Sequence, residues 1–154
     1  MSTTTATSEE SSVTAEHLQM CMGTLIDLQL QAKQVHWNVR GSGFLSFHRF
    51  LDELYQAIGE QIDTLAERIV TLGRHADGTI GTISETTKLK SLKPGRMSVA
   101  KGVDIVVDRL VVSTKLLRES IDQIQELDEV SKDILSPMIA DLEKFRWLTE
   151  SQVE

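Results

Sequence analysis

Four long stretches of the chain carry apolar residues three or four positions apart, which is the spacing of one face of an α-helix. They cover residues 15–40, 45–72, 98–126 and 131–151. No stretch shows the strict alternation of a half-buried strand. The sequence therefore predicts an all-α protein, built as a bundle of four amphipathic helices. In the first stretch the apolar positions are Leu18, Met22, Leu25, Leu28, Ala32 and Val35.

The N-terminal stretch differs from the rest of the chain. Residues 1–13 consist mainly of Ser, Thr, Ala and Glu, with almost no apolar anchor, so we expect a flexible acidic tail. Thr14 is a candidate N-cap for the first helix, with Glu16 in its first turn. These features predict one folded domain over residues 14–154.

A long connection separates the second and third predicted helices. Residues 74–97 contain glycines, threonines and Pro94, and they are numerous enough to cross the length of a bundle. Such a crossover makes the first two helices one antiparallel pair and the last two another. Structureless loops of this length are uncommon, so we expect a short helix within the connection. Gly73 is a candidate helix stop, and Pro137 predicts a bend in the fourth helix.

The charge balance limits the partners of this chain. It has 23 acidic against 16 basic residues, a net charge of −7, which disfavours simple binding to nucleic acid or anionic membranes and suits cations. The one cysteine, Cys21, excludes an intramolecular disulfide and is expected to pack as a small apolar residue. Without a secretory signal pattern or an apolar run long enough for a membrane span, the sequence predicts a cytoplasmic protein.

Two pairs of metal-binding residue types lie on the second predicted helix. His48 and Asp52 are four residues apart, and so are Asp63 and Glu67. Residues four apart share a helix face, and eleven residues at about 100° each return nearly to the same face. All four side chains should therefore lie on one stripe of this helix.

The two pairs cannot meet within one chain, because eleven residues at ~1.5 Å each separate them by about 16 Å. An antiparallel two-fold pairing of two such helices would place each pair opposite the other pair of the partner and form two identical sites. The axis would pass near residue 57 or 58. Gly59 could allow close approach there, or be a merely tolerated helix glycine. His36, near the end of the first helix, lies where it could complete the cluster.

Two imidazoles and three carboxylates form a mixed nitrogen and oxygen ligand set, which suits Fe(II), with Zn(II) or Mn(II) as competitors. The bundle interior offers no rival Glu-x-x-His motif, because none of the four histidines has Glu three residues before it. The alternative is that the histidines are structural and the carboxylates only solvent-facing. Spacing alone leaves both interpretations open.

The segment 33–41 resembles the signature K-x-x-H-W-N-x-x-G of the Dps family, and residues 63–68 resemble its D-x-x-A-E-R motif. The resemblance implies a ferritin-like bundle assembled into a hollow dodecamer. It implies oxidation of Fe(II) to Fe(III), preferably by hydrogen peroxide, with storage of the ferric mineral and protection against oxidative damage. In the implied ferroxidase site, one chain supplies His36, His48 and Asp52, and its partner supplies Asp63 and Glu67.

The resemblance also implies roles outside the ligand set. Trp37 would serve catalysis as an electron relay or radical sink, although a packed aromatic is the alternative. Asp128, Glu129 and Asp133 correspond to acidic residues that line pores for iron uptake on the three-fold axes. Alternatively, these acids simply favour the N-terminus of the fourth helix.

Many Dps proteins bind DNA through basic terminal tails, and this chain departs from that pattern. No Lys or Arg precedes Lys33, and the last one is Arg146, so we expect little DNA binding near physiological salt. One basic cluster remains, which could act multivalently or be a solvated connection. It comprises Lys88, Lys90, Lys93, Arg96 and Lys101.

Two other functions stay open at this point. One is a DNA-compacting protein whose iron chemistry is secondary, against which the tails argue. The other is a metal-dependent hydrolase that uses the same ligands around Zn(II) or Mn(II) to activate water.

Overall fold

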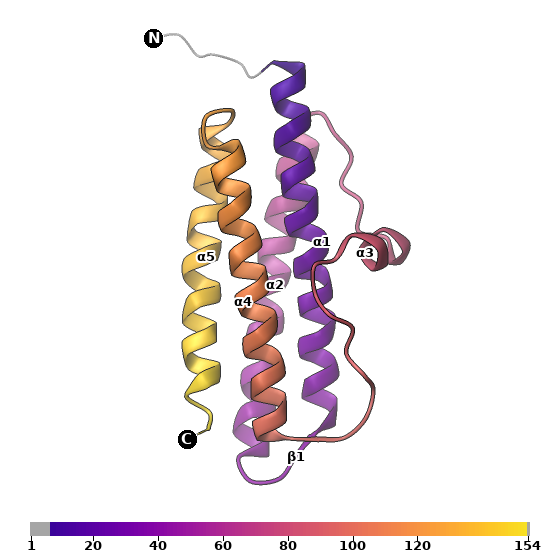
Figure 1. Ribbon diagram of the computed structural model, residues 1–154, viewed down its shortest axis with the longest axis vertical. Helices are drawn as coiled ribbons and strands as arrows, with labels where there is room; N and C mark the ends of the chain where they lie inside the picture. The colour runs from indigo at the N-terminus through magenta and orange to yellow at the C-terminus, as the bar shows by residue number, and fades with distance from the viewer. Residues whose placement is uncertain (1–6, 154) are drawn as a thin grey trace.

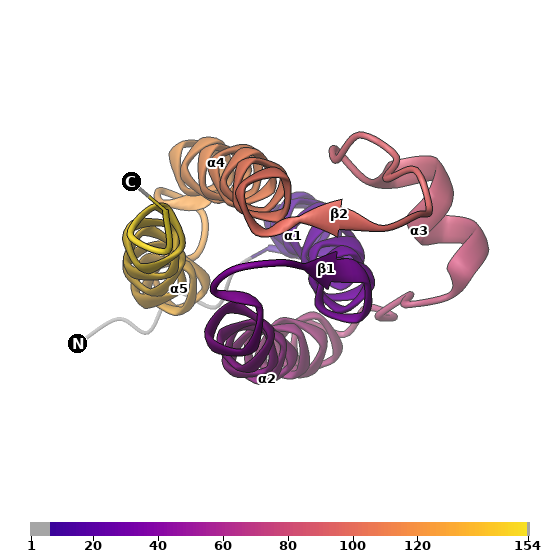
Figure 2. The ribbon, with the colours of Figure 1, turned by 90° about the horizontal axis from the view of Figure 1, so that it is seen from below.

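The computed structural model describes residues 7–153 and contains four long helices that form a bundle (Figure 1). In chain order the elements are α1 (Ser8–Asn38), β1 (Val39–Arg40), α2 (Phe44–Thr71), α3 (Ile80–Thr86), β2 (Met97–Ser98), α4 (Val99–Ile124) and α5 (Glu129–Glu150). The view along the bundle shows α1 beside α2 and α4, with α5 beside α4 and α2 (Figure 2). The predicted four-helix bundle is confirmed.

The first helix begins earlier than the sequence predicted. Thr7, not Thr14, is the N-cap: its side chain accepts a hydrogen bond from the Glu10 backbone, and the Glu10 carboxylate accepts one from the Thr7 backbone. This reciprocal capping box satisfies two helix-end N–H groups, so the helix can extend beyond the apolar core. Thr14 is instead buried within α1. Of the expected tail, residues 1–6 lie outside the described residues.

Smaller differences occur at two other helix ends. α1 ends at Asn38 rather than Arg40, because Val39 and Arg40 pair in parallel with Met97 and Ser98. This two-residue pairing ties the end of α1 to the start of α4. α5 begins at Glu129, two residues before the predicted start, because Asp128 caps it.

The crossover runs the length of the bundle and makes α2 and α4 parallel (Figure 1). It contains the expected short helix, α3, whose Ile83 is buried. Polar side chains of α1 hold the crossover in place: Gln19 bonds twice with the Asp77 backbone, and Asp27 accepts from Thr87. The predicted stop at Gly73 is also confirmed, since Gly73 has φ 76° and the Gly73 and Arg74 N–H groups bond back to Val70 and Ile69.

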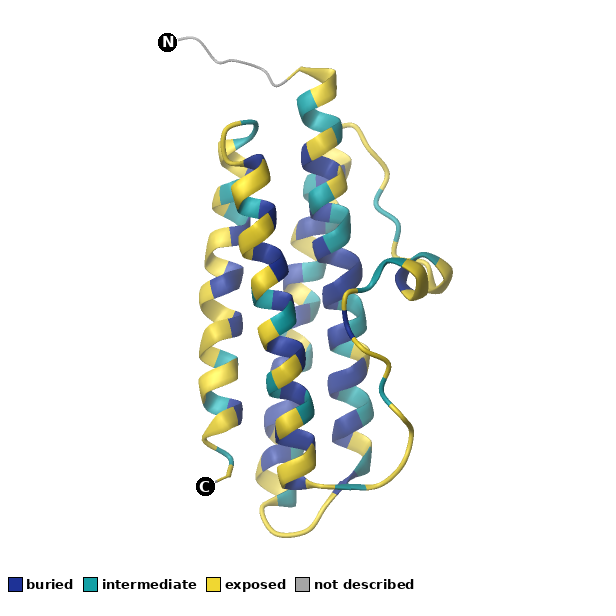
Figure 3. Cartoon of the chain, in the orientation of Figure 1, coloured by how far each residue is buried: buried dark blue, intermediate teal, exposed yellow. Residues whose placement is uncertain are grey.

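Buried residues run along the inward faces of all four long helices (Figure 3). Cys21 belongs to this core, as predicted, and donates a hydrogen bond to Ser120. Burial raises the pKa of its thiol to about 11. Pro137 lies within α5, which continues past it. No helix in residues 7–153 has the length and apolar character to cross a membrane.

Candidate metal centre

His36 and His48 hold each other in a reciprocal contact at the end of the α1–α2 hairpin. The Nδ1 atom of His36 lies 2.7 Å from the His48 carbonyl oxygen, and Nδ1 of His48 lies 2.9 Å from the His36 carbonyl oxygen. The rings stack with their centroids 3.6 Å apart. A carbonyl oxygen only accepts, so each Nδ1 carries the proton and donates it. In the neutral imidazole with Nδ1 protonated, Nε2 holds the lone pair, and this is the tautomer that binds a metal through Nε2.

Asp52 lies beside this pair of histidines, on the next turn of α2. Its Oδ1 atom is 3.5 Å from Nδ1 of His36, and it forms an ion pair with the ammonium of Lys33. The hydrogen bond from Lys33 is the main reason why the pKa of the Asp52 carboxyl lies below its usual range; partial burial acts against it, and His36 and His48 add to the lowering. Asp52 is thus an ionised carboxylate next to two imidazoles.

Lys33 is a site residue that the ligand pattern did not identify. Its ammonium pairs with Asp52 and also lies 5.1 Å from the ring centroid of Tyr55. Lys33 is one helical turn before His36, so the two side chains share a face of α1. A cation therefore already occupies one side of the Asp52 carboxylate in the single chain.

Asp63 and Glu67 do not join the other three candidates. Both side chains are exposed on α2. Within residues 7–153, no group of three or more His, Cys, Asp or Glu side chains is placed to hold a metal ion. The chain by itself brings His36, His48 and Asp52 close together without arranging them as a complete metal site, and it leaves the second carboxylate pair apart.

The exposed face of α2 carries two large apolar residues along with these ligands. Leu45 is 52% exposed and Val70 is 59% exposed. Leu45 and Val70 are centred on the same point as His48 and Glu67, between residues 57 and 58. A two-fold axis at that point would place Leu45 opposite Val70 of the partner subunit and His48 opposite Glu67 of the partner subunit. Apolar contacts would then enclose the polar site at both ends.

A contact within the chain explains why glycine occupies position 59, and the sequence did not reveal it. A Cβ atom at this position would lie 2.8 Å from Nε2 of Gln29 on α1. That amide nitrogen donates a hydrogen bond to the Tyr55 carbonyl at 2.9 Å. The glycine thus makes room for a contact between α1 and α2, and the expected role at a two-fold axis stays a prediction.

Trp37 is adjacent to His36 in the sequence, but the two side chains lie in different parts of the protein. Its side chain is 57% exposed and lines a cavity of about 540 Å³ between α1, α3 and the crossover. Neighbouring residues on a helix point about 100° apart, which separates the indole from the inward-facing imidazole. Within one chain Trp37 is not a packed core aromatic.

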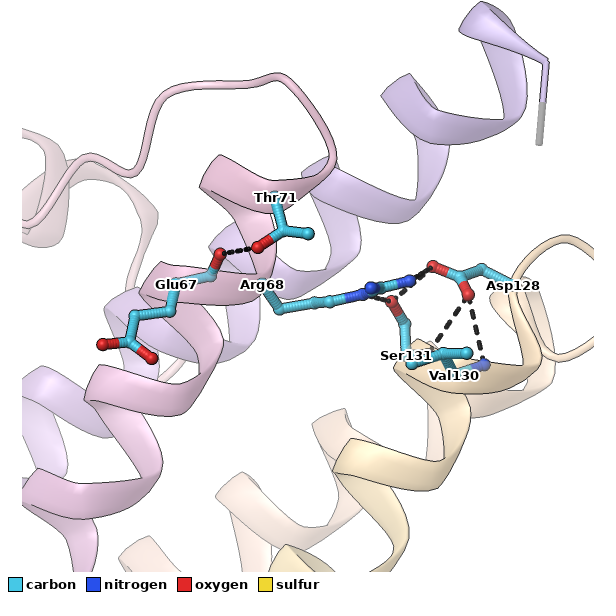
Figure 4. A network of polar contacts seen from close by, with 6 residues as sticks. All are labelled: Glu67, Arg68, Thr71, Asp128, Val130 and Ser131. Carbon is cyan, nitrogen blue, oxygen red and sulfur yellow. Dashed lines mark hydrogen bonds and ion pairs between the residues drawn. The ribbon is translucent and has the colours of Figure 1, made fainter. Parts of the chain in front are cut away.

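The three acids predicted for a pore differ in their surroundings. Asp128 caps α5, where its side chain accepts from the Val130 and Ser131 N–H groups, and it pairs with Arg68 at 2.7 Å (Figure 4). Burial by itself would raise the pKa of Asp128, but hydrogen bonds from Ser131 and Arg68 outweigh it, and the pKa lies below its usual value. Glu129 and Asp133 are exposed, with Asp133 3.0 Å from the Lys132 ammonium.

Asp128, the N-cap of α5, also connects this helix to the end of α2 that carries Glu67. Arg68, which follows Glu67, also donates to the Ser131 hydroxyl at 2.9 Å, while Thr71 bonds to the Glu67 carbonyl (Figure 4). Both Asp128 oxygens accept protein hydrogen bonds, so Asp128 caps the helix as the N-terminus alternative stated, and its place at a pore stays a prediction.

Comparison with known proteins identifies the family. A profile of the ferritin-like domain matches residues 15–154. The chain is 33% identical to the DNA protection during starvation protein of Agrobacterium fabrum over 138 residues, covering 89% of this chain and 85% of the relative. The chain belongs to the Dps family of ferritin-like proteins.

Solved Dps structures share the complete fold. The structure of Mycobacterium smegmatis Dps superposes with a TM-score of 0.94 at 30% identity, covering 100% of this chain and 94% of that one. Dps from Microbacterium arborescens in the high iron form gives a TM-score of 0.90 at 30% identity, with 96% of both chains covered. These matches confirm the predicted ferritin-like Dps fold.

Proposed function

We propose that this Dps chain is a ferroxidase and an iron-storage protein that protects against oxidative damage. The observation that carries the proposal is the reciprocal contact of His36 and His48, which commits both Nδ1 atoms to backbone carbonyls, with the ionised Asp52 3.5 Å from Nδ1 of His36. Two imidazoles and a carboxylate suit Fe(II). The family assignment agrees with iron storage, and one solved relative is described as a high iron form.

The proposed site is shared between two subunits. His36, His48 and Asp52 of one chain would bind iron together with the partner's Asp63 and Glu67. The exposed Leu45 and Val70 fit this pairing, because a two-fold axis between residues 57 and 58 would place each against the other in the partner and remove both from water. The arrangement we propose for the assembly is a hollow dodecamer, located in the cytoplasm.

Iron is the substrate, and hydrogen peroxide is the proposed oxidant. Each of two Fe(II) ions gives up one electron, the O–O bond of peroxide accepts both, and its oxygens become water or hydroxide. Because both electrons go to one peroxide, no hydroxyl radical is released. The carboxylates would bind the Fe(II) ions through oxygen, and each imidazole would donate its Nε2 lone pair to a Fe(II) ion. The role of Trp37 as an electron relay remains part of this proposal.

Removal of the partner's carboxylates tests the site. In an Asp63→Ala, Glu67→Ala double variant we expect loss of rapid Fe(II) oxidation by peroxide, followed by absorbance of the ferric product. The matched control is Asp104→Ala, Asp122→Ala, which removes two exposed carboxylates of α4. Mass measurement of the assembly confirms that both variants associate. Unchanged oxidation in the first variant would contradict the assigned site.

Iron uptake is proposed to pass by Glu129 and Asp133, which are exposed at the start of α5. Asp128 is left out of this proposal, because its oxygens already cap the helix and bind Arg68. Exposed carboxylates around an axis would attract cations. We expect a Glu129→Ala, Asp133→Ala variant to take up iron more slowly at low Fe(II) concentration. Equal uptake rates would exclude this route.

A further inference from the structure

A cavity of about 430 Å³ lies where the crossover meets the first turns of α4. One wall consists of residues 91–96 of the crossover. The other wall is formed by four residues spaced four apart in the sequence, the first in β2 and the other three on one face of α4. These residues are Met97, Lys101, Ile105 and Arg109.

The charge of this cavity is opposite to that of the whole chain. Lys93, Arg96, Lys101 and Arg109 line it, and none of its lining residues is acidic, although the chain as a whole carries −7. In the described part of the chain, Lys93, Arg96 and Lys101 have no carboxylate within ion-pair distance, and neither do Lys88 and Lys90 of the same basic cluster. The positive charge at the rim is therefore uncompensated.

Arg109 differs from these exposed cations because it is only 7% exposed and is held in one position. Its Nε atom donates to Oε1 of Gln31 at 2.8 Å, and its Nη1 atom pairs with Asp108. Gln31 is itself fixed, since its amide nitrogen donates to Asp27 and to the Lys90 carbonyl, each at 3.0 Å. The guanidinium is thus ordered before any ligand arrives.

One side of this guanidinium remains available. Within residues 7–153, Nη2 of Arg109 makes no hydrogen bond to the protein, and it is not among the polar atoms sealed from solvent without a partner. Arg109 lines the cavity, and Nη2 is the part of its guanidinium that has no protein acceptor. The N-terminal end of α4 is nearby and adds a partial positive charge.

We propose that this cavity binds a small phosphate anion, either inorganic phosphate or a short oligophosphate. Arg109 would donate to the phosphate oxygens from the buried wall, since a guanidinium matches their geometry. Lys93, Arg96 and Lys101 would neutralise the remaining charge at the rim. The site is independent of the metal centre and involves none of its ligands.

The experiment is calorimetric titration of the intact assembly with sodium phosphate and with sodium tripolyphosphate, at constant ionic strength set by chloride. We expect saturable binding that an Arg96→Glu, Lys101→Glu variant weakens at least tenfold, because two charge-assisted contacts are reversed. An Arg109→Lys variant keeps the charge but loses the planar guanidinium with its paired N–H donors, and it should bind severalfold more weakly. The control Lys115→Glu, Lys144→Glu makes the same charge change elsewhere on the exposed surface and should bind normally.

Three results would overturn the proposal. The first is the absence of saturable binding of either anion. The second is an equal loss in both double variants, which would mean a general effect of net charge. The third is binding of a DNA duplex that depends on Arg96 and Lys101 while phosphate binding does not, because a rigid duplex can reach the rim but not the buried Arg109. The rim variants decide the question even where Arg109→Lys fails to fold.

Discussion

The guanidinium of Arg68 meets the carboxylate of Asp128 at 2.7 Å and thereby joins the end of α2 to the N-cap of α5. The Asp128 side chain is 9% exposed and that of Arg68 is 18% exposed, so water screens this pair only partly. Asp128 therefore has two structural roles, a helix cap and half of an inter-helix ion pair. The following prediction separates them.

Replacement of Asp128 by Ala should lower the free energy of unfolding by about 2–4 kcal/mol, because it removes the cap and leaves the Arg68 charge unpaired. Asp128→Asn should cost about half as much, since asparagine caps helices as well as aspartate does. The measurement is the denaturant midpoint at fixed protein concentration. Asp141→Ala, a change on the exposed face of α5, is the control. Equal losses in the Ala and Asn variants would argue against the cap, and no loss in Asp128→Asn would argue against the ion pair.

The same residue predicts a pH dependence. The pKa of Asp128 is lowered in the folded protein, so its stabilising effect is complete above the usual aspartate pKa of about 3.9 and disappears as the pH falls through the lowered value. The stability difference between the wild type and Asp128→Asn should therefore be constant near neutral pH and shrink below about pH 4. Unfolding midpoints at a series of pH values test this. A difference that persists at the lowest pH would contradict it.

The shared metal site predicts complementation between two inactive variants. A chain with His48→Ala and Asp52→Ala keeps the second carboxylate pair, and a chain with Asp63→Ala and Glu67→Ala keeps the first half-site. Each variant alone should be inactive. When both chains are co-assembled, each mixed two-fold dimer should contain one intact and one empty site. Fe(II) oxidation should reappear in proportion to the mixed dimers, and continued inactivity of a verified mixed assembly would contradict a shared site.

Lys33 predicts competition for Asp52. Because its ammonium already pairs with this carboxylate, Lys33→Gln should increase the affinity for a redox-inert divalent ion such as Zn(II) by about two- to fivefold. Calorimetric titration measures the change. Lys115→Gln, which breaks an exposed pair with Glu119, is the matched control. A weaker affinity in Lys33→Gln would mean that Lys33 positions Asp52 for the metal instead of competing with it.

Two glycines in helices predict opposite effects of the same substitution. A Cβ atom at Gly102 would lie 2.9 Å from both Phe47 Cε1 and Val39 Cγ1, whereas one at Gly81 would have no atom within 4 Å. Gly102→Ala should destabilise the protein by about 1–2 kcal/mol, because overpacking exceeds the gain in helix propensity. Gly81→Ala should be neutral or stabilising by up to about 1 kcal/mol. Denaturant midpoints compare the two variants, and similar effects would contradict the packing argument.

The local pattern of the sequence determined the helices, because periodic burial and helix stops depend on neighbours three to four residues away. It predicted the crossover with its short helix and the stop at Gly73. It also placed His36 and His48 at the same end of a hairpin. The start of α1 was missed because the apolar pattern outweighed the capping box of Thr7 and Glu10, although this signal is present in the sequence.

Contacts between distant segments were decided only by the tertiary structure. Three such contacts depend on how two helices are rotated against each other. They are the reciprocal hydrogen bonds of His36 and His48, the ion pair of Lys33 with Asp52, and the ion pair of Arg68 with Asp128. Helical spacing fixes which residues share a face, but not which side chain that face meets. The metal-binding stripe of α2 could therefore be predicted from the sequence, whereas the carbonyl groups that orient His36 and His48 and the ammonium that pairs with Asp52 could not.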